Sequence, residues 1–136
     1  MLSFGREMVF LALFFLSALG GDMKVKQGVD LTGMHPQMIH AFNALMAIHI
    51  DDGYEATVTS GREGKHSVTS SHYSGNAIDV RTKDLPPTLP IETFAQDIRE
   101  RLPVGFRVII EGVGQEDEHV HVQYRPVWNE IGSSYE

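Results

Sequence analysis

Two short stretches of the sequence carry side chains that commonly bind metal ions. The first, SSHYSGNAID, places His72 and Asp79 seven residues apart with Gly75 between them. The second, EDEHVHVQY, places His119 and His121 two residues apart. The chain contains no cysteine, so any zinc site must be built from imidazole nitrogens and carboxylate oxygens.

The HVHV pattern predicts a strand with one imidazole face. Side chains alternate between the two faces of a strand, so His119, His121 and Gln123 share one face and Val120 and Val122 share the other. Two interpretations of the imidazole face follow from the residues. It is the solvent face of an edge strand, or it is part of a site.

The spacing of His72 and Asp79 favours a loop that folds back on itself. A regular helix would separate such residues by two turns, roughly 10 Å. A turn at Gly75 and Asn76, residue types that tolerate unusual backbone angles, can instead bring them together. With His121 they make three ligands and leave a fourth position open for water, which is the pattern of a catalytic zinc.

A zinc-activated water also needs a general base, and the residues alone leave its identity open. Three acids, Glu116, Asp117 and Glu118, precede the histidine pair. Strict alternation places Asp117 on the face of His121 and Glu118 on the opposite face. A twist or bulge at the start of the strand would bring Glu118 round to the site.

The elements that must position these residues can be read from hydrophobic periodicity. Apolar side chains recur at helical spacing in two segments and at strand spacing in four, with a glycine-rich hairpin connection before the last strand. We expect helices at 36–50 and 91–102, strands at 54–60, 77–81, 105–111 and 119–124, and the hairpin connection at 112–117. The pattern predicts an α+β fold in which two helices pack against a small, mainly antiparallel sheet.

Length and charge restrict the class of protein. The chain has 136 residues, which suits one domain, and its net charge is −7. A chain with this charge is disfavoured as a nucleic-acid-binding protein, because such proteins neutralise phosphates with lysine and arginine. We expect no nucleic-acid partner and a monomer.

Residues 8–19, MVFLALFFLSAL, form an uninterrupted apolar run. The run is shorter than the about 20 residues that a membrane span needs and matches the core of an export signal. Three interpretations are open: a cleaved signal, a short uncleaved anchor, or an upstream extension with the true start at Met23. We therefore separate residues 1–22 from one domain at 23–136, and expect any membrane contact only through residues 8–19.

The two motifs together resemble a known family. The pattern S-x-H-x-x-G-x-A-x-D is matched by Ser70, His72, Gly75, Ala77 and Asp79, and E-x-x-H by Glu118 and His121. Residues 24–125 resemble the zinc D-alanyl-D-alanine carboxypeptidases and L-alanyl-D-glutamate endopeptidases of peptidoglycan, a group related to the lysostaphin-type peptidases and the hedgehog domain. The resemblance implies that domain 23–136 is a zinc peptidase with a hedgehog-like fold.

The resemblance also implies roles for individual residues. It assigns His72, Asp79 and His121 as ligands of Zn²⁺, and it selects Glu118 over Asp117 as the general base. The chain departs from the family in its short segment between Arg62 and His72, which makes the substrate-recognition elements hard to map. His66, inside that segment, is interpreted as an ordinary loop residue.

Three further residues receive roles from the resemblance. Arg62 lies where the family carries an arginine that stabilises the oxyanion, although it is equally interpretable as a loop arginine. His119 would assist catalysis, contact substrate or support a metal ligand through a hydrogen bond. Ser70 would hydrogen-bond in the metal loop or bind substrate, and no base is placed to make it a nucleophile.

The substrate implied by the resemblance is the stem peptide of peptidoglycan. Internal cleavage at L-Ala-D-Glu and removal of the terminal D-Ala both stay open, and the compact chain favours an endolysin-type endopeptidase. The alternatives are a zinc-containing cell-wall or peptide-binding module without catalysis, and an acidic structural domain whose histidines bind nothing. An export signal would place the protein in the periplasm or cell envelope. Without one, a cytoplasmic phage endolysin acting on the wall is implied.

Overall fold

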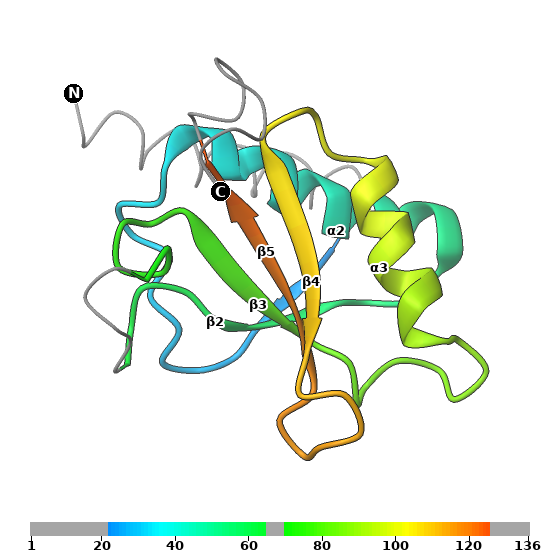
Figure 1. The fold of residues 1–136 in the computed structure, drawn as a ribbon. Helices are drawn as coiled ribbons and strands as arrows, with labels where there is room; N and C mark the ends of the chain where they lie inside the picture. Colours follow the sequence, from blue (N-terminus) through cyan, green and yellow to red (C-terminus); the bar gives the residue numbers. More distant parts are fainter. Residues whose placement is uncertain (1–21, 65–69, 126–136) are drawn as a thin grey trace.

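The structure is a computed structural model, and it describes residues 22–64 and 70–125. Its helices and strands follow one another along the chain as Figure 1 shows. They are β1 (Lys24–Val25), a short 3-10 helix (Pro36–Met38), α2 (Ile39–Asp52), β2 (Thr57–Ser60), β3 (Ala77–Arg81), α3 (Ile91–Glu100), β4 (Phe106–Glu111) and β5 (His119–Tyr124).

The five strands form one sheet in the order β1-β2-β3-β5-β4. Only the pairing of β1 with β2 is parallel, and the other three pairings are antiparallel. Strand β5 therefore lies inside the sheet, hydrogen-bonded to β3 on one side and β4 on the other. The interpretation of HVHV as the solvent face of an edge strand is wrong, because β4 and β1 occupy the edges.

The core lies between the helices and one face of the sheet. Phe94 and Ile98 of α3 and Phe42 of α2 are fully buried, and so are Val80 and Val120 from the strands. Helical spacing collects the apolar side chains of α3 on one stripe, which packs against β4. Burial of these side chains removes apolar surface from water and holds the helices on this face.

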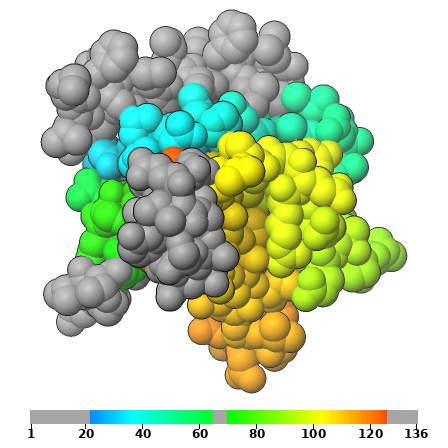
Figure 2. Space-filling view, turned by 45° about the horizontal axis from the view of Figure 1, so that its top comes forward, coloured from blue at the N-terminus to red at the C-terminus, as the bar shows by residue number. Residues whose placement is uncertain are grey.

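The opposite face of the sheet is polar and carries the candidate site. In β5 every second residue is buried, and the histidines alternate with them as the sequence predicts. Asp79 and Arg81 of β3 point to this same polar face. Figure 2 shows the connection between β4 and β5 (orange) protruding below α3 (yellow-green).

The predicted α+β class is confirmed, and the differences are local. Strand β3 and strand β5 match their predicted bounds, whereas β2 begins at Thr57 rather than at residue 54. The two-residue β1 was not predicted, because so short a strand has no periodicity to read. The likeness to the hedgehog domain in particular stays a prediction.

The predictions for the N-terminal run and for His66 fall outside the described residues. Within residues 22–64 and 70–125, no helix is both long enough and apolar enough to cross a membrane. The assignment of residues 8–19 as a signal or anchor stays a prediction.

Candidate metal site

The loop from Ser70 to Asn76 folds tightly through its own hydrogen bonds. The Ser70 hydroxyl accepts the backbone N–H of His72 at 3.2 Å, and Asn76 N–H donates to the Ser71 carbonyl at 2.8 Å. A further backbone bond joins Gly75 N–H to the His72 carbonyl at 3.1 Å. Ser70 thus shapes the loop that presents His72, which is one of the two roles predicted for it.

Gly75 allows this loop to approach the segment before the 3-10 helix. Its φ is +77°, a region that favours glycine, and its carbonyl accepts the backbone N–H of His35 at 2.8 Å. A Cβ at this position would lie 2.6 Å from the Gly33 carbonyl oxygen and 3.0 Å from the Cα of Met34. The predicted turn at Gly75 is present, and close packing adds a second requirement for glycine.

Gly75→Ala is expected to lower the free energy of unfolding by about 2–4 kcal/mol, because it combines an unfavourable φ with a backbone clash. Gly53→Ala is a matched control, since Gly53 has φ +81° and open space around it. Its expected loss is about 1 kcal/mol, the conformational cost alone. Denaturant unfolding with a metal chelator present measures both, and equal losses would contradict the packing argument.

Three side chains meet where the loop approaches β3 and β5. Asp79 is the direct cross-strand partner of His121, and its Oδ1 lies 2.8 Å from His121 Nδ1. The other oxygen, Oδ2, lies 3.4 Å from His72 Nε2. The side chains of His72, Asp79 and His121 are only 6%, 16% and 12% exposed. They are close enough to bind one metal ion, with one ligand atom from each.

The outer ring nitrogen of each imidazole is held by an oxygen. His72 Nδ1 lies 2.9 Å from the Gly61 carbonyl, which can only accept, so Nδ1 carries the proton. His121 Nε2 lies 2.8 Å from Gln123 Oε1 and donates to it. In their neutral forms both rings therefore direct a lone pair at Asp79, whose carboxylate also only accepts.

Acceptors facing one another at these distances require positive charge between them. A proton on either imidazole is one source of such charge, and the pKa values describe that case. Burial acts to raise the pKa of Asp79, but hydrogen bonds from His121 and His72 and the charges of His72 and His119 outweigh it and hold that pKa well below its usual range. The pKa of His121 is raised, because its bond to Asp79 outweighs burial. A divalent cation would satisfy all three groups at once.

Glu118, which directly precedes β5, is held by two hydrogen bonds. The Thr82 hydroxyl donates to its Oε1 at 2.7 Å, and the backbone N–H of Gly114 donates to its Oε2 at 2.9 Å. These two donors, Gly114 first, lower the pKa of Glu118. The two donors therefore favour the ionised form of the carboxylate and set its orientation.

Strict alternation along the strand had placed Glu118 on the face opposite His121, and the structure removes this conflict. Strand β5 begins at His119, so Glu118 belongs to the preceding turn and alternation does not set its direction. The one-to-one pairing of β5 with β3 runs from His119 to Gln123, and a bulge is not needed. The register shift in this sheet lies instead between Val58 and Ser60 of β2.

A cleft of about 280 Å³ opens on the polar face next to these groups. Asp79 and His119 form part of its lining, together with both candidate bases, Asp117 and Glu118. A small substrate in this cleft would contact the ligand Asp79 and the two acids of the turn. The cleft therefore meets the metal group at Asp79.

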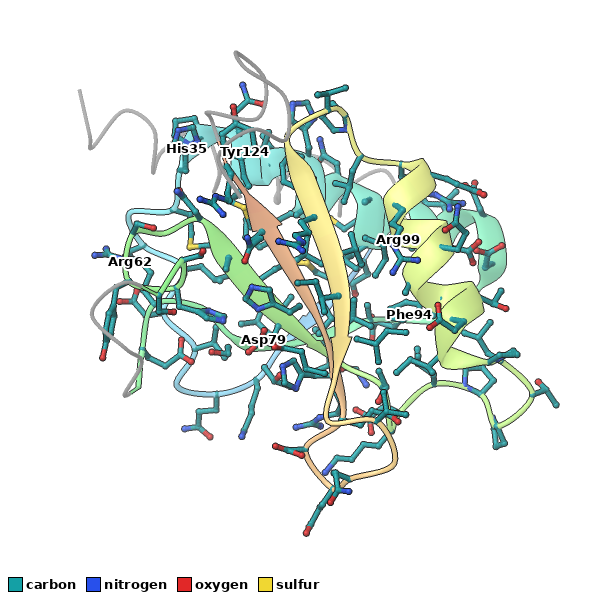
Figure 3. The ribbon with its side chains drawn as sticks, in the orientation of Figure 1. His35, Arg62, Asp79, Phe94, Arg99 and Tyr124 are labelled. Carbon is teal, nitrogen blue, oxygen red and sulfur yellow. The ribbon has the colours of Figure 1, made fainter. Side chains whose placement is uncertain are left out.

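The structure does not bring the Arg62 side chain to the group of His72, Asp79 and His121. The Arg62 guanidinium donates to the carbonyls of Tyr73 at 3.3 Å and Thr32 at 3.1 Å. Figure 3 shows the side chain at the edge of the molecule, directed away from Asp79. Here Arg62 ties two loops together, as an ordinary loop arginine does, and its oxyanion role stays a prediction.

His119 belongs to a second, more open group. Its Nδ1 lies 2.7 Å from the Asp117 carbonyl, and its Nε2 lies 3.0 Å from Glu111 Oε1 and 3.7 Å from Asp79 Oδ1. Asp79, Glu111 and His119 could also bind a cation. Glu111 is 49% exposed, so this group is less shielded than the group around His72. The buried group is therefore the better shielded candidate for a metal ion, and His119 faces the cleft.

Glu63 holds the backbone of Gly61, the residue whose carbonyl contacts His72. Its Oε1 accepts the backbone N–H groups of Gly61 at 2.8 Å and Asp30 at 2.9 Å. Gly61 in turn supplies the carbonyl that orients His72. Burial alone would raise the pKa of Glu63, but these backbone donors and the Ser60 hydroxyl lower it below the ordinary value of 4.5.

Glu63→Gln is expected to lower the free energy of unfolding at pH 7 by about 1–3 kcal/mol, since the hydrogen bonds to a charged acceptor become weaker bonds to a neutral amide oxygen. A depressed folded-state pKa stabilises the fold above pH 4.5, and this contribution disappears as the pH falls through the folded-state pKa. The difference between wild type and variant should therefore shrink in acid. Denaturant unfolding of the chelator-treated proteins at pH 7 and pH 3 measures it.

Glu100→Gln is the matched control for this experiment, because Glu100 is exposed at the end of α3 and makes one long hydrogen bond, 3.4 Å, to Gln96. A loss as large in this control, or a Glu63→Gln loss that is independent of pH, would contradict the role given to Glu63.

Sequence reasoning missed several residues that hold the ligands in place. These are Gly61 and Gln123, which orient the two imidazoles, Thr82, which orients Glu118, and Glu111, which pairs with His119. Only Gln123 gave a signal, because it shares a strand face with the two histidines. The other three act through contacts between segments that are separate in the sequence.

Comparison of the chain with protein-family models, with curated proteins and with solved structures finds no match. The peptidase resemblance therefore depends on the residues of the two motifs alone.

Proposed function

We propose that the protein is a zinc metallopeptidase that hydrolyses a peptide bond in the stem peptide of peptidoglycan. The observation that carries the proposal is the group of His72, Asp79 and His121, whose donor atoms converge while Gly61 and Gln123 hold the imidazoles from behind. Two nitrogens and one carboxylate are a donor set typical of catalytic zinc, which keeps a position open.

The donor set fits zinc in its chemistry. A zinc ion bound there would lower the pKa of a bound water toward 7 and polarise the peptide carbonyl. The chain itself supplies the proton transfer: Glu118, held by Thr82 and Gly114, is the base that takes a proton from the attacking water and passes it to the leaving amine. Burial of the three ligands keeps competing water away from them.

His119 has a supporting role in this proposal. It is 23% exposed, lines the cleft, and is held by the Asp117 carbonyl and Glu111. A cationic imidazole in this position would stabilise negative charge that develops on a bound carbonyl oxygen. The proposal can therefore supply an oxyanion contact without moving Arg62.

The second candidate is a zinc-containing binding module without catalysis. The open cleft and the buried ligands would serve a bound peptide equally well. The position of Glu118 favours the enzyme, because it lines the cleft together with Asp79, where hydrolysis needs a carboxylate and peptide binding alone does not.

The test combines metal analysis with digestion of purified peptidoglycan. Wild-type protein loaded with zinc is expected to contain one zinc per chain and to release new amino termini, and mass analysis of the fragments names the bond. His121→Ala should lose both, while His40→Ala, which replaces a histidine on α2, should keep both. Zinc without new termini would favour the binding module, and no zinc in metal-replete protein would reject both candidates.

A further inference from the structure

The cleft carries a cluster of cations that the proposed chemistry does not use. Lys26, Arg81 and Lys83 all line it, and we call these three residues the cationic cluster. The protein as a whole has a net charge of −7, with 11 lysines and arginines against 18 acids. Four acids also line the cleft, so its three cations nearly balance the acids there, although the chain as a whole is acidic.

The fold brings the cationic cluster together from two distant segments. Lys26 follows β1, and its backbone N–H donates to the Val58 carbonyl at 2.9 Å, which joins it to β2. Arg81 ends β3, and its Nη1 lies 3.1 Å from Asp84. That ion pair fixes the guanidinium beside the cleft. In the described part of the chain, neither Lys26 nor Lys83 forms an ion pair, so both ammonium groups are available to a ligand.

The register of the sheet gives the distance from Arg81 of the cationic cluster to the candidate metal ligand Asp79. Arg81 lies two residues beyond Asp79 on the same face of β3 and opposite His119 of β5. Two residues of a strand span roughly 6.6 Å. An extended peptide whose scissile carbonyl lies at Asp79 would therefore reach the cluster with a group about two residues away.

The neighbouring acids restrict what the cluster can bind. Glu116, Asp117 and Glu118 line the same cleft. A polyphosphate or nucleic acid would be repelled by them, whereas one carboxylate can lie against the cations and avoid the acids. Arginine and lysine at this position suit the charge-assisted hydrogen bonds that a carboxylate forms.

We propose that the cationic cluster of Lys26, Arg81 and Lys83 binds a free carboxylate of the substrate, within about two residues of the scissile bond. The inference rests on the proposed peptidase function and adds a substrate class to it: acidic peptides rather than neutral or amidated ones. In a stem peptide the α-carboxylate of a γ-linked D-glutamate is a group of this kind.

The experiment measures binding separately from hydrolysis. Zinc-loaded Glu118→Gln protein is titrated with two fluorescent peptides, acetyl-L-Ala-γ-D-Glu-L-Lys-amide and the same peptide with the D-glutamate α-carboxylate converted to a carboxamide. The carboxylate peptide is expected to bind about tenfold more tightly, and the preference should weaken as salt is added. Equal affinities, or no binding of either peptide at millimolar concentration, would overturn the inference.

Charge reversals in the same background locate the contact. Lys26→Glu and Lys83→Glu should each remove most of the preference for the carboxylate peptide without changing the zinc content. Lys24→Glu changes the net charge equally, but Lys24 lies outside the cleft and pairs with Glu55, so the preference should persist. A loss as large with Lys24→Glu would show that net charge rather than the cluster is responsible.

Hydrolysis by the wild-type protein keeps the two proposals apart. Cleavage of both peptides with equal KM supports the peptidase and rejects the cluster as a carboxylate site. Tight, selective binding of the carboxylate peptide without cleavage supports the cluster and rejects the peptidase.

Discussion

Asp79→Asn is expected to abolish metal binding, with an affinity loss of more than about 100-fold. Asp79 contacts both imidazoles, with Oδ1 at 2.8 Å from His121 and Oδ2 at 3.4 Å from His72. Asparagine keeps the shape but removes the negative charge and turns one oxygen into an N–H donor. Loss of an outer hydrogen-bond partner typically costs 10–100-fold in affinity, and loss of a charged ligand should cost more.

Zinc titration against a competing chelator measures this loss. Asp52→Asn is the matched control, since Asp52 lies at the end of α2, 3.9 Å from Arg101 and outside the site. It should bind zinc as the wild type does. If Asp79→Asn still bound one equivalent of zinc at wild-type affinity, Asp79 would not be a ligand. That result would also count against the more exposed group of Asp79, Glu111 and His119, because Asp79 belongs to both groups.

Glu118→Gln is expected to reduce kcat by about 10²–10⁴-fold while zinc remains bound. The amide has nearly the shape of the carboxylate and can still accept from Thr82 or Gly114, but it cannot take a proton from water. Because Glu118 is not among the three donors, the metal content should stay at that of the wild type. Initial rates on the stem-peptide substrate, measured beside zinc content, give both quantities.

Asp117→Asn separates the two candidate bases. Both acids line the cleft, but the Asp117 backbone carbonyl already holds His119, and strand alternation alone had favoured its side chain as the base. If Glu118 is the base, Asp117→Asn should keep most of the activity. The reverse pattern, an active Glu118→Gln and an inactive Asp117→Asn, would reassign the base.

Much of the fold follows from local pattern. The alternation in HVHVQY and the helical stripe of residues 91–102 predicted β5 and α3 because each element buries one side against the core. The pairing order could not be read in the same way. Nothing local in β5 shows that it lies between β3 and β4, since this depends on which distant strands pair with it.

The candidate ligands were also visible in the sequence. The spacing of His72 and Asp79 around Gly75 predicted a turn, and the turn is present with φ +77° at Gly75. The close approach of Gly33 to Gly75 was not visible, because it joins two segments about forty residues apart. The same holds for Gly61, whose role is that of a backbone carbonyl and has no side-chain signal.

By itself the sequence determined the types of donor: imidazole and carboxylate without thiolate, in a chain whose helix and strand periods are plain. Only the tertiary structure decided that Asp79 faces both His72 and His121, because cross-strand register and a folded loop fix those distances. It also decided that Glu118 lies before the strand rather than in it. Residue types determine which atoms can bind a metal, whereas the pairing of distant segments determines the distances and orientations of those atoms.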